Sequence, residues 1–179
     1  MHRLLACLLL FPLLASANPA TPEDTVARLW RALSHEPGAS ADVAALKRLF
    51  HADAVVFGVS YKDGAASIRR TAIGDFLRGQ ETVSGKGFHE CEVTRDMKVY
   101  DRFAAVSSVV ETRQDKTAIH SQFVCINSIQ LYKADAEWKI LSLYYQLEKK
   151  GEPIPLSDGK PGRCLTDAVQ PDGARPPGA

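Results

Sequence analysis

The chain has 179 residues, of which 45% are apolar and 24% charged, and its formal net charge is +1. This composition is typical of a folded globular protein and excludes a disordered chain or a coiled coil. Without residues 1–17, which include Arg3, acidic and basic side chains balance at 21 each. The balance argues against charge-driven binding to nucleic acid or to an anionic membrane, because both need a basic excess.

Residues 1–17 have the features of a signal peptide. A short positive start precedes an apolar stretch over residues 4–14, and Ala15-Ser16-Ala17 then fits the small-residue rule for cleavage before Asn18. We therefore expect export to the periplasm or the medium. The remaining 162 residues are enough for one domain with a single core, and they contain no second apolar run that would span a membrane.

Two amphipathic helices are predicted at the start of this domain. Thr21 is a potential N-cap, and apolar residues then recur at helical spacing until Leu33. Pro37-Gly38 predicts the end of the helix. A second helix is predicted to begin at Ser40 and to reach Phe50.

A short β-hairpin and a third helix are predicted to follow. Residues 54–60 are rich in β-formers, and Asp63-Gly64 is a turn signal that predicts a return strand within residues 61–67. The spacing of apolar side chains favours a third helix over residues 71–84.

The apolar period changes to two from residue 88 onward. It predicts four long strands, residues 88–100, 102–113, 118–133 and 138–149. Their short connections require antiparallel neighbours, hence a meander. Strands of this length twist and curl, so we expect an α+β domain whose three N-terminal helices pack in the concavity of a strongly curved, mainly antiparallel sheet. Such a cone-shaped domain contains a pocket.

The last part of the chain differs in composition from the rest. Glycine and proline are frequent in residues 151–179, which predicts an extended tail that is disordered at its end. We therefore expect three parts: a signal peptide over residues 1–17, the α+β domain over residues 18–150, and the tail.

The cysteines after residue 17 are Cys91, Cys125 and Cys164, whose spacing matches no zinc or redox motif. If the first and third late strands flank the second, Cys91 and Cys125 lie two strand spacings apart, roughly 9.6 Å. A disulfide needs Cα atoms within about 7 Å. Any bridge should therefore join Cys164 to Cys91 or to Cys125.

Alternation places candidate binding residues on the last two strands. Asn127 shares a face with apolar neighbours, and it is either a hydrogen-bonding group of the pocket or a structural residue satisfied by a loop. Trp138, Tyr144, Gln146 and Glu148 share a face if no bulge intervenes, and the last three lie where the pocket mouth is expected.

Two further residues have alternative interpretations. Glu148 would act as a base if desolvation raised its pKa, or it caps a helix or pairs with a cation. His89 faces the same side as Cys91, so the two are either a nucleophile pair or a core histidine beside a small apolar residue. Their separation along the strand, about 6.6 Å, is too long for a direct hydrogen bond. No metal site is expected.

Several C-terminal segments resemble the nuclear-transport-factor-2-like superfamily, also called SnoaL-like or cystatin-like. The element order helix-helix-strand-helix followed by a meander is similar, and so are three short motifs: Asn127-Ser128-Ile129-Gln130-Leu131-Tyr132, Trp138-Lys139-Ile140-Leu141-Ser142 with Gln146-x-Glu148, and Pro153-Ile154-Pro155. The resemblance covers about residues 21–156. Within the superfamily, the three motifs are similar to those of an exported bacterial subgroup without an established activity. It implies the cone-shaped fold.

The catalytic residues of the enzymes in that superfamily are not matched in this chain. The resemblance to the steroid isomerases of the superfamily implies a general-base Asp near the end of the first strand, where this chain has Phe57-Gly58-Val59. It also implies a Tyr in the first helix as an oxyanion donor, and this first helix contains no Tyr. The Asp-Arg-Asp set of the epoxide hydrolases is matched only in pieces, at Arg95-Asp96 and Arg113-x-Asp115.

Three functional hypotheses follow from the sequence. The first is a domain that binds a small, largely apolar molecule in the cone, without a cofactor, and that pairs as a homodimer through its sheet. The second is a small cofactor-free isomerase, dehydratase or hydrolase that uses general acid-base chemistry. The third is a purely structural module for dimerisation or partner binding.

Overall fold

The computed structural model describes residues 21–165, so the proposed signal peptide and the far end of the tail lie outside the described residues. Nine elements follow one another in this order: α1 (Pro22–Leu33), α2 (Val43–Leu49), β1 (Phe50–Lys62), β2 (Ala65–Ala72), α3 (Ile73–Gln80), β3 (His89–Tyr100), β4 (Phe103–Arg113), β5 (Phe123–Ala134) and β6 (Glu137–Leu147). Within this part of the chain, no helix has the length and apolar character needed to cross a membrane.

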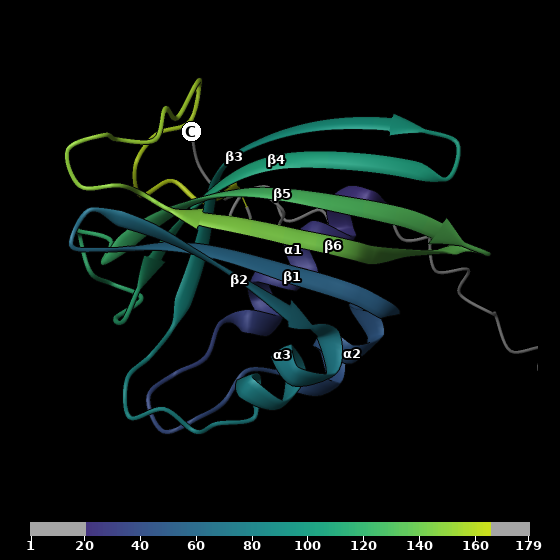
Figure 1. Ribbon diagram of the computed structural model, residues 1–179, viewed down its shortest axis with the longest axis horizontal. Coiled ribbons are helices and arrows are strands. Elements are labelled where there is room, and N and C mark those ends of the chain that lie inside the picture. Colours follow the sequence, from purple (N-terminus) through teal and green to yellow (C-terminus); the bar gives the residue numbers. More distant parts are fainter. Residues whose placement is uncertain (1–20, 166–179) are drawn as a thin grey trace, which may run out of the picture.

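The strands form one six-stranded mixed sheet in the order β2-β1-β6-β5-β4-β3 (Figure 1). The four late strands pair antiparallel with their sequence neighbours, which confirms the predicted meander. β1 pairs parallel with β6, so the N-terminal hairpin of β1 and β2 extends the meander. The predicted α+β class is confirmed. The helices pack on one face of the sheet, here called the inner face, and the opposite face is the outer face.

The first helix begins as predicted and ends earlier than predicted. Thr21 and Asp24 form a capping box. The helix ends at Leu33 because the next residues pair with a strand: the His35 N–H donates to the Phe88 carbonyl at 2.7 Å. The predicted continuation to Pro37-Gly38 is therefore wrong.

The second and third helices are also shorter than predicted. Asp42, not Ser40, caps α2, by accepting a hydrogen bond from the Ala45 N–H at 2.8 Å. Thr71 and Ala72 were assigned to the third helix, but they pair with β1 as the end of β2. Pairing with β1 therefore outweighs the helix propensity of these two residues, and this pairing could not be predicted from local sequence.

The turn at Asp63-Gly64 is confirmed, because both residues have positive φ, 51° and 80°. This left-handed conformation suits a two-residue hairpin loop, in which glycine and aspartate are preferred. The start of the third late strand is not confirmed. Residues 118–122 are turn and irregular structure, and β5 begins only at Phe123.

Two apolar clusters stabilise the domain. The larger lies between the helices and the inner face and includes Leu29, Leu46 and Ile129, none of which has exposed surface. The smaller lies on the outer face, where Val93 and Val109 are covered by tail residues from the segment 151–165. The tail is thus packed against the sheet over its described part.

Candidate functional site

A cavity of about 290 Å³ lies between the inner face and helices α1 and α3. Its walls are mostly apolar, and the aromatic side chains among them are Trp30, Phe76, Phe88, Phe123 and Tyr145. Three polar residues also line the cavity, Gln80, Glu90 and Asn127, and so does the thiol of Cys125. A few polar groups in an apolar cavity are typical of a small-molecule site.

The strand register explains why polar groups meet in this cavity. Ser108, Asn127, Tyr145 and Gly58 form one row across β4, β5, β6 and β1. Opposed residues of neighbouring strands face the same side of a sheet. Asn127 and Tyr145 therefore project together from the floor of the cavity.

Gly58 creates the space that Tyr145 occupies. A Cβ atom at Gly58 would lie 2.3 Å from the Tyr145 hydroxyl oxygen and from its Cζ. No side chain fits at this distance, so the ring lies directly over the glycine backbone. The position of Tyr145 in the cavity wall thus depends on the absence of a side chain in β1.

Glu90 is the ionisable carboxyl group of the cavity. It stands near the start of β3, where its N–H donates to Ser34 Oγ at the end of α1 at 2.9 Å. The Thr112 hydroxyl donates to Glu90 Oε2 at 2.7 Å. Burial raises the pKa of Glu90 to about 7, although the hydrogen bond from Thr112 opposes the shift. At neutral pH, Glu90 is therefore able both to accept and to give a proton.

The neighbouring acid on the same face of β3 is used differently. Glu92 has no exposed surface, and it accepts hydrogen bonds from Ser108 Oγ at 2.7 Å and from Arg95 Nε at 2.9 Å. This pairing neutralises the buried charge of Glu92. Among residues 21–165, Glu90 forms no ion pair with a cation, so the two acids have separate roles.

Cys125 is the free thiol near Glu90. Burial, together with the charge of Glu90, raises the pKa of Cys125 to about 12. The thiol is therefore protonated at neutral pH and behaves as a small apolar wall residue. It is not a nucleophile in this state.

Comparison with known proteins adds evidence on the fold. No family model matches the chain, and no curated protein sequence matches it. Among solved structures, a protein of unknown function with a cystatin-like fold from Nostoc punctiforme PCC 73102 is similar, with a TM-score of 0.54 and 14% identity over 73% of this chain and 90% of that chain. A proposed ketosteroid isomerase from Parabacteroides distasonis ATCC 8503 has a TM-score of 0.51 and 15% identity over 75% of this chain and 93% of that chain. An NTF2-like protein of unknown function from Silicibacter pomeroyi DSS-3 has a TM-score of 0.49 and 16% identity over 70% and 92% of the two chains.

The chain has a cystatin-like fold. The resemblance seen in the sequence is confirmed at this level.

In this domain, β6 does not keep the alternation that the sequence suggested. Ile140 pairs with Leu131 but Ser142 pairs with Gln130, so Leu141 is an extra, bulged residue. A bulge of one residue exchanges the faces of everything beyond it. The expectation that Trp138 shares a face with Tyr144, Gln146 and Glu148 held only without a bulge, and the bulge at Leu141 makes it wrong.

The bulge places two of these candidates outside the inner cavity. Tyr144 and Gln146 lie on the outer face, where the Tyr144 hydroxyl donates to Gln146 Oε1 at 2.8 Å and Gln146 Nε2 donates to the Tyr61 hydroxyl at 2.9 Å. The cavity receives Tyr145 and Leu147 instead.

The other two candidates on β6 have structural surroundings. Glu148 Oε2 accepts a hydrogen bond from the Ile154 N–H at 2.9 Å, which fastens the start of the tail. Trp138 is 6% exposed and lies at the far end of the sheet, with Lys133 Nζ 5.9 Å from its ring centroid. Neither residue lines the inner cavity.

Asn127 lines the cavity, but part of its amide is already used. Its Nδ2 donates to the carbonyls of Ser108 at 3.3 Å and Cys125 at 3.4 Å. The polar atom that remains for a ligand is Oδ1. Asn127 thus lines the cavity, as the first alternative expected, and the carbonyls that hold its amide belong to β4 and β5 and not to a loop.

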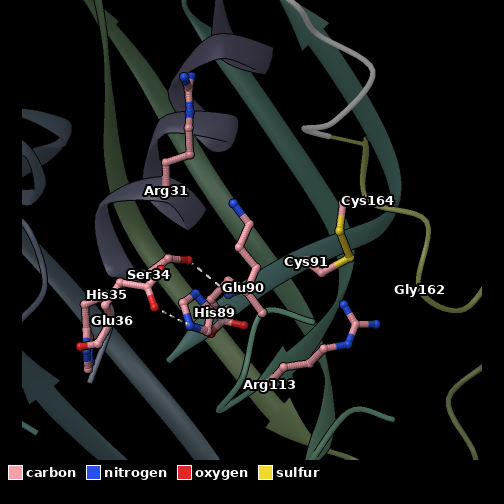
Figure 2. A pocket seen from close by; sticks show the side chains of 11 residues that line it. Arg31, Ser34, His35, Glu36, His89, Glu90, Cys91, Arg113, Gly162 and Cys164 are labelled. Atoms are coloured by element: carbon pink, nitrogen blue, oxygen red, sulfur yellow. Dashed lines mark hydrogen bonds and ion pairs between the residues drawn. A yellow bond between two sulfur atoms is a disulfide. The ribbon is translucent and has the colours of Figure 1, made fainter. Parts of the chain in front are cut away.

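His89 and Cys91 lie on the outer face of β3, as their shared parity predicts, but they form no pair. Cys91 is bonded to Cys164, with a Cα–Cα distance of 5.0 Å. Of the two pairings left open by the sequence, the structure has this one. His89 lines a separate, polar cavity, together with Glu36, whose Oε2 is 3.6 Å from His89 Nε2 (Figure 2).

Glu90 and Trp30 are cavity residues that were not among those predicted from the sequence. Glu90 and Glu92 alternate with His89 and Cys91, so two acids on the face opposite the cysteine were a visible signal. Trp30 was correctly placed on the apolar face of α1, but nothing in its helical spacing separates a cavity wall from a filled core. Among residues 21–165, no group of three or more potential metal ligands occurs.

Proposed function

We propose that this NTF2-like domain binds a small, largely apolar molecule in the inner cavity. The observation that supports this proposal best is Trp30. Its side chain lines the cavity, and its buried Nε1 has no hydrogen-bond partner among the described residues. A buried indole N–H normally has an acceptor, and a carbonyl or hydroxyl oxygen of a ligand would supply one.

The size and lining of the cavity define the ligand further. A volume of about 290 Å³ lies at the lower end of the range for small-molecule sites. Aromatic walls favour a flat or cyclic apolar body. The ligand would therefore have one or two rings and a single oxygen that accepts from Trp30.

Titration calorimetry with β-ionone, an apolar ketone, tests the proposal. Trp30→Phe keeps the aromatic packing but removes the N–H, and it is expected to weaken binding about tenfold. Leu147→Phe narrows the cavity and should weaken binding too, whereas Leu141→Phe, on the same strand but away from the cavity, is the matched control. If neither β-ionone nor a set of related cyclic ketones and alcohols binds, or if the three variants bind alike, the proposal is wrong.

Glu90 supports a second candidate function, general acid-base catalysis in the same cavity. A carboxylate with a pKa of about 7 is matched to proton transfer at neutral pH. It would remove a proton next to a ligand carbonyl whose oxygen is held by Trp30, and it would return the proton at another carbon. The solved structure from Parabacteroides distasonis, described as a proposed ketosteroid isomerase, is in keeping with this chemistry.

The conversion of a β,γ-unsaturated cyclic ketone to its conjugated isomer, followed by ultraviolet absorbance, tests this second function. Glu90→Gln should abolish turnover while β-ionone still binds. Glu148→Gln is the matched control, because Glu148 contacts the tail and not the cavity. Equal rates for the two variants would exclude Glu90 as the base and leave the binding proposal intact.

We also propose export of this protein. The Cys91–Cys164 disulfide supports it, because such bonds persist in oxidising compartments. Detection of the mature N-terminus at Asn18 in secreted or periplasmic material would test cleavage. The domain over residues 18–150 and the attached tail are proposed to act as one exported unit.

A homodimer through the outer face is a fourth proposal. Large apolar side chains are exposed there on the late strands, among them Phe103, Ile126 and Tyr132. Exposed apolar residues in such a group favour association. Light scattering on Tyr132→Lys against the parent protein is expected to show a loss of dimer, and a parent protein that is monomeric at high concentration would contradict the proposal.

A further inference from the structure

A second, larger cavity of about 460 Å³ lies beside the start of β3. Figure 2 shows its walls: the end of α1 with Arg31, the first residues of β3, the end of β4 with Arg113, and the tail at Gly162 and Cys164. This polar cavity is distinct from the apolar one on the inner face. Glu90 borders both.

Two buried nitrogen atoms in this polar cavity have no hydrogen-bond partner, although the Glu36 carboxylate lies 3.6 Å from one of them, His89 Nε2. They are Arg113 Nε and His89 Nε2, and the part of the chain that the structure describes contains only one other such side-chain atom. Arg113 is 7% exposed. An unsatisfied buried donor is rare and costly, so Arg113 Nε indicates a missing acceptor at this cavity, and His89 Nε2 would share that acceptor when it carries the ring proton.

The sheet register places these two residues opposite each other at the edge of the polar cavity. His89 and Arg113 are directly opposed residues of β3 and β4, so their side chains leave the same face. The Nη2 atom of Arg113 is already engaged by the Glu111 carboxylate, to which the Gly162 N–H also donates at 3.0 Å. Glu111 thus fixes the guanidinium and leaves Nε free.

The charges around the cavity favour an anion. Arg31 and Lys116 also line it, and neither has an acidic partner within 4 Å among residues 21–165. The opposing acids are Glu111, which is paired with Arg113, Glu36, which is 72% exposed, and Glu90, whose pKa of about 7 leaves it partly neutral. The three cations Arg31, Lys116 and Arg113 therefore face two ionised acids and one partly neutral acid.

We propose that the polar cavity is a binding site for an oxyanion, a carboxylate or phosphate group carried by a small organic molecule. Arg113 Nε donates to it, His89 donates when Nε2 carries the ring proton, and Arg31 and Lys116 supply charge. A volume of about 460 Å³ exceeds what a bare ion needs, so the anion belongs to a larger molecule. This site is independent of the apolar ligand proposed above.

The test is a titration of the disulfide-intact protein with inorganic phosphate and, separately, with succinate. Binding is followed by the side-chain ¹H–¹⁵N signals of His89 and of the Arg113 Nε–H. Saturable shifts of these signals with either anion support the site, and the anion that binds more tightly identifies its class. Shifts that do not saturate with either anion would overturn the proposal.

Variants separate a specific site from general charge. Lys116→Gln and Arg31→Gln change exposed residues and should each weaken binding several-fold, while Arg113→Lys removes the Nε donor but keeps the positive charge beside Glu111 and should weaken it about tenfold. Lys98→Gln, at the far end of β3, is the matched control. Equal weakening by Lys98→Gln would show nonspecific attraction and refute the site, and the two exposed variants keep this comparison valid if Arg113→Lys fails to fold.

Discussion

The Thr112 hydroxyl donates a 2.7 Å hydrogen bond to Glu90 Oε2 across the β3–β4 pair, where the two residues are directly opposed. This bond lowers the pKa of Glu90, but burial has the larger effect and raises the pKa to about 7. The proton affinity of the inner cavity is therefore set by one threonine and by the exclusion of water.

Thr112→Val removes the hydroxyl at nearly constant volume. Because the hydrogen bond to the charged carboxylate is lost, the pKa of Glu90 is expected to rise above 7. The carboxyl ¹³C chemical shift of Glu90, followed against pH, measures the change. Thr71→Val in β2, at the opposite edge of the sheet, should leave it unchanged. A pKa of Glu90 that stays the same or falls in Thr112→Val would contradict the assigned role of the hydroxyl.

Glu90 should also make the stability of the domain fall as pH rises. Its pKa is about 7 in the folded state and 4.5 in the reference state, so below pH 4.5 both states are protonated and Glu90 carries no penalty. Between these two values the unfolded state loses its proton first, and the free energy of unfolding decreases. From pH 5 to pH 8, the loss is about 2 to 3 kcal/mol relative to Glu90→Gln.

Urea unfolding of the parent protein and of Glu90→Gln at both pH values measures this difference. The variant controls for every other titrating group. If the free energies of unfolding of the two proteins change by the same amount between pH 5 and pH 8, Glu90 has an ordinary pKa.

Cys125 should resist alkylation in the folded protein. With a pKa of about 12, its thiolate is a fraction of roughly 10⁻⁴ at pH 8, and the thiolate is the reactive form. Iodoacetamide labelling followed by peptide mapping should show slow modification of Cys125 and rapid modification in urea. Glu90→Gln removes the charge that contributes to the shift, so labelling should become faster. Rapid labelling of the folded parent protein would mean that the thiol is not buried in solution.

The disulfide should hold the tail on the sheet and stabilise the fold. Cys91 and Cys164 are separated by 73 residues, and a closed loop of that length corresponds to about 4 kcal/mol in the chain-entropy model. Cys164→Ser is expected to lose up to this amount in urea unfolding and to make residues 151–165 sensitive to protease. Cys125→Ser, which leaves the bridge intact, is the control. An unchanged midpoint for Cys164→Ser would show that the tail is held by its apolar contacts alone.

The meander and the broad element order could be predicted from the sequence because they depend on local periodicity. The four late strands alternate over ten residues or more, and short turns such as the one at Asp101 leave only antiparallel neighbours. Helix ends could not be predicted, because His35 and Ala39 are drawn into bridges with Phe88 and Ser84 that lie far along the chain.

The site was harder to predict than the fold. One bulged residue, Leu141, reverses the faces of Tyr144 and Tyr145. The bulge could not be predicted, because no residue type is specific to bulges of this kind. The parity of β3, which has no such interruption before Glu92, was readable and would have placed Glu90 on the inner face. What parity does not give is whether an inward residue borders a cavity or a filled core, since that depends on side chains from α1 and α3.

Gly58 provides the most direct test of this dependence on packing. In Gly58→Ala, the new methyl group would lie 2.3 Å from the Tyr145 hydroxyl, so the Tyr145 ring must move, and the inner cavity is the open space beside it. Overpacking of this kind costs about 1 to 3 kcal/mol. We therefore expect lower stability together with weaker β-ionone binding in calorimetry. Gly79→Ala is the matched control, because its Cβ would meet no atom within 4 Å and lies in helix α3, where alanine is favoured over glycine. If Gly58→Ala were destabilised but bound β-ionone as the parent protein does, Tyr145 would not be part of the binding wall, and the ligand would have to rest against Trp30 and Glu90 alone.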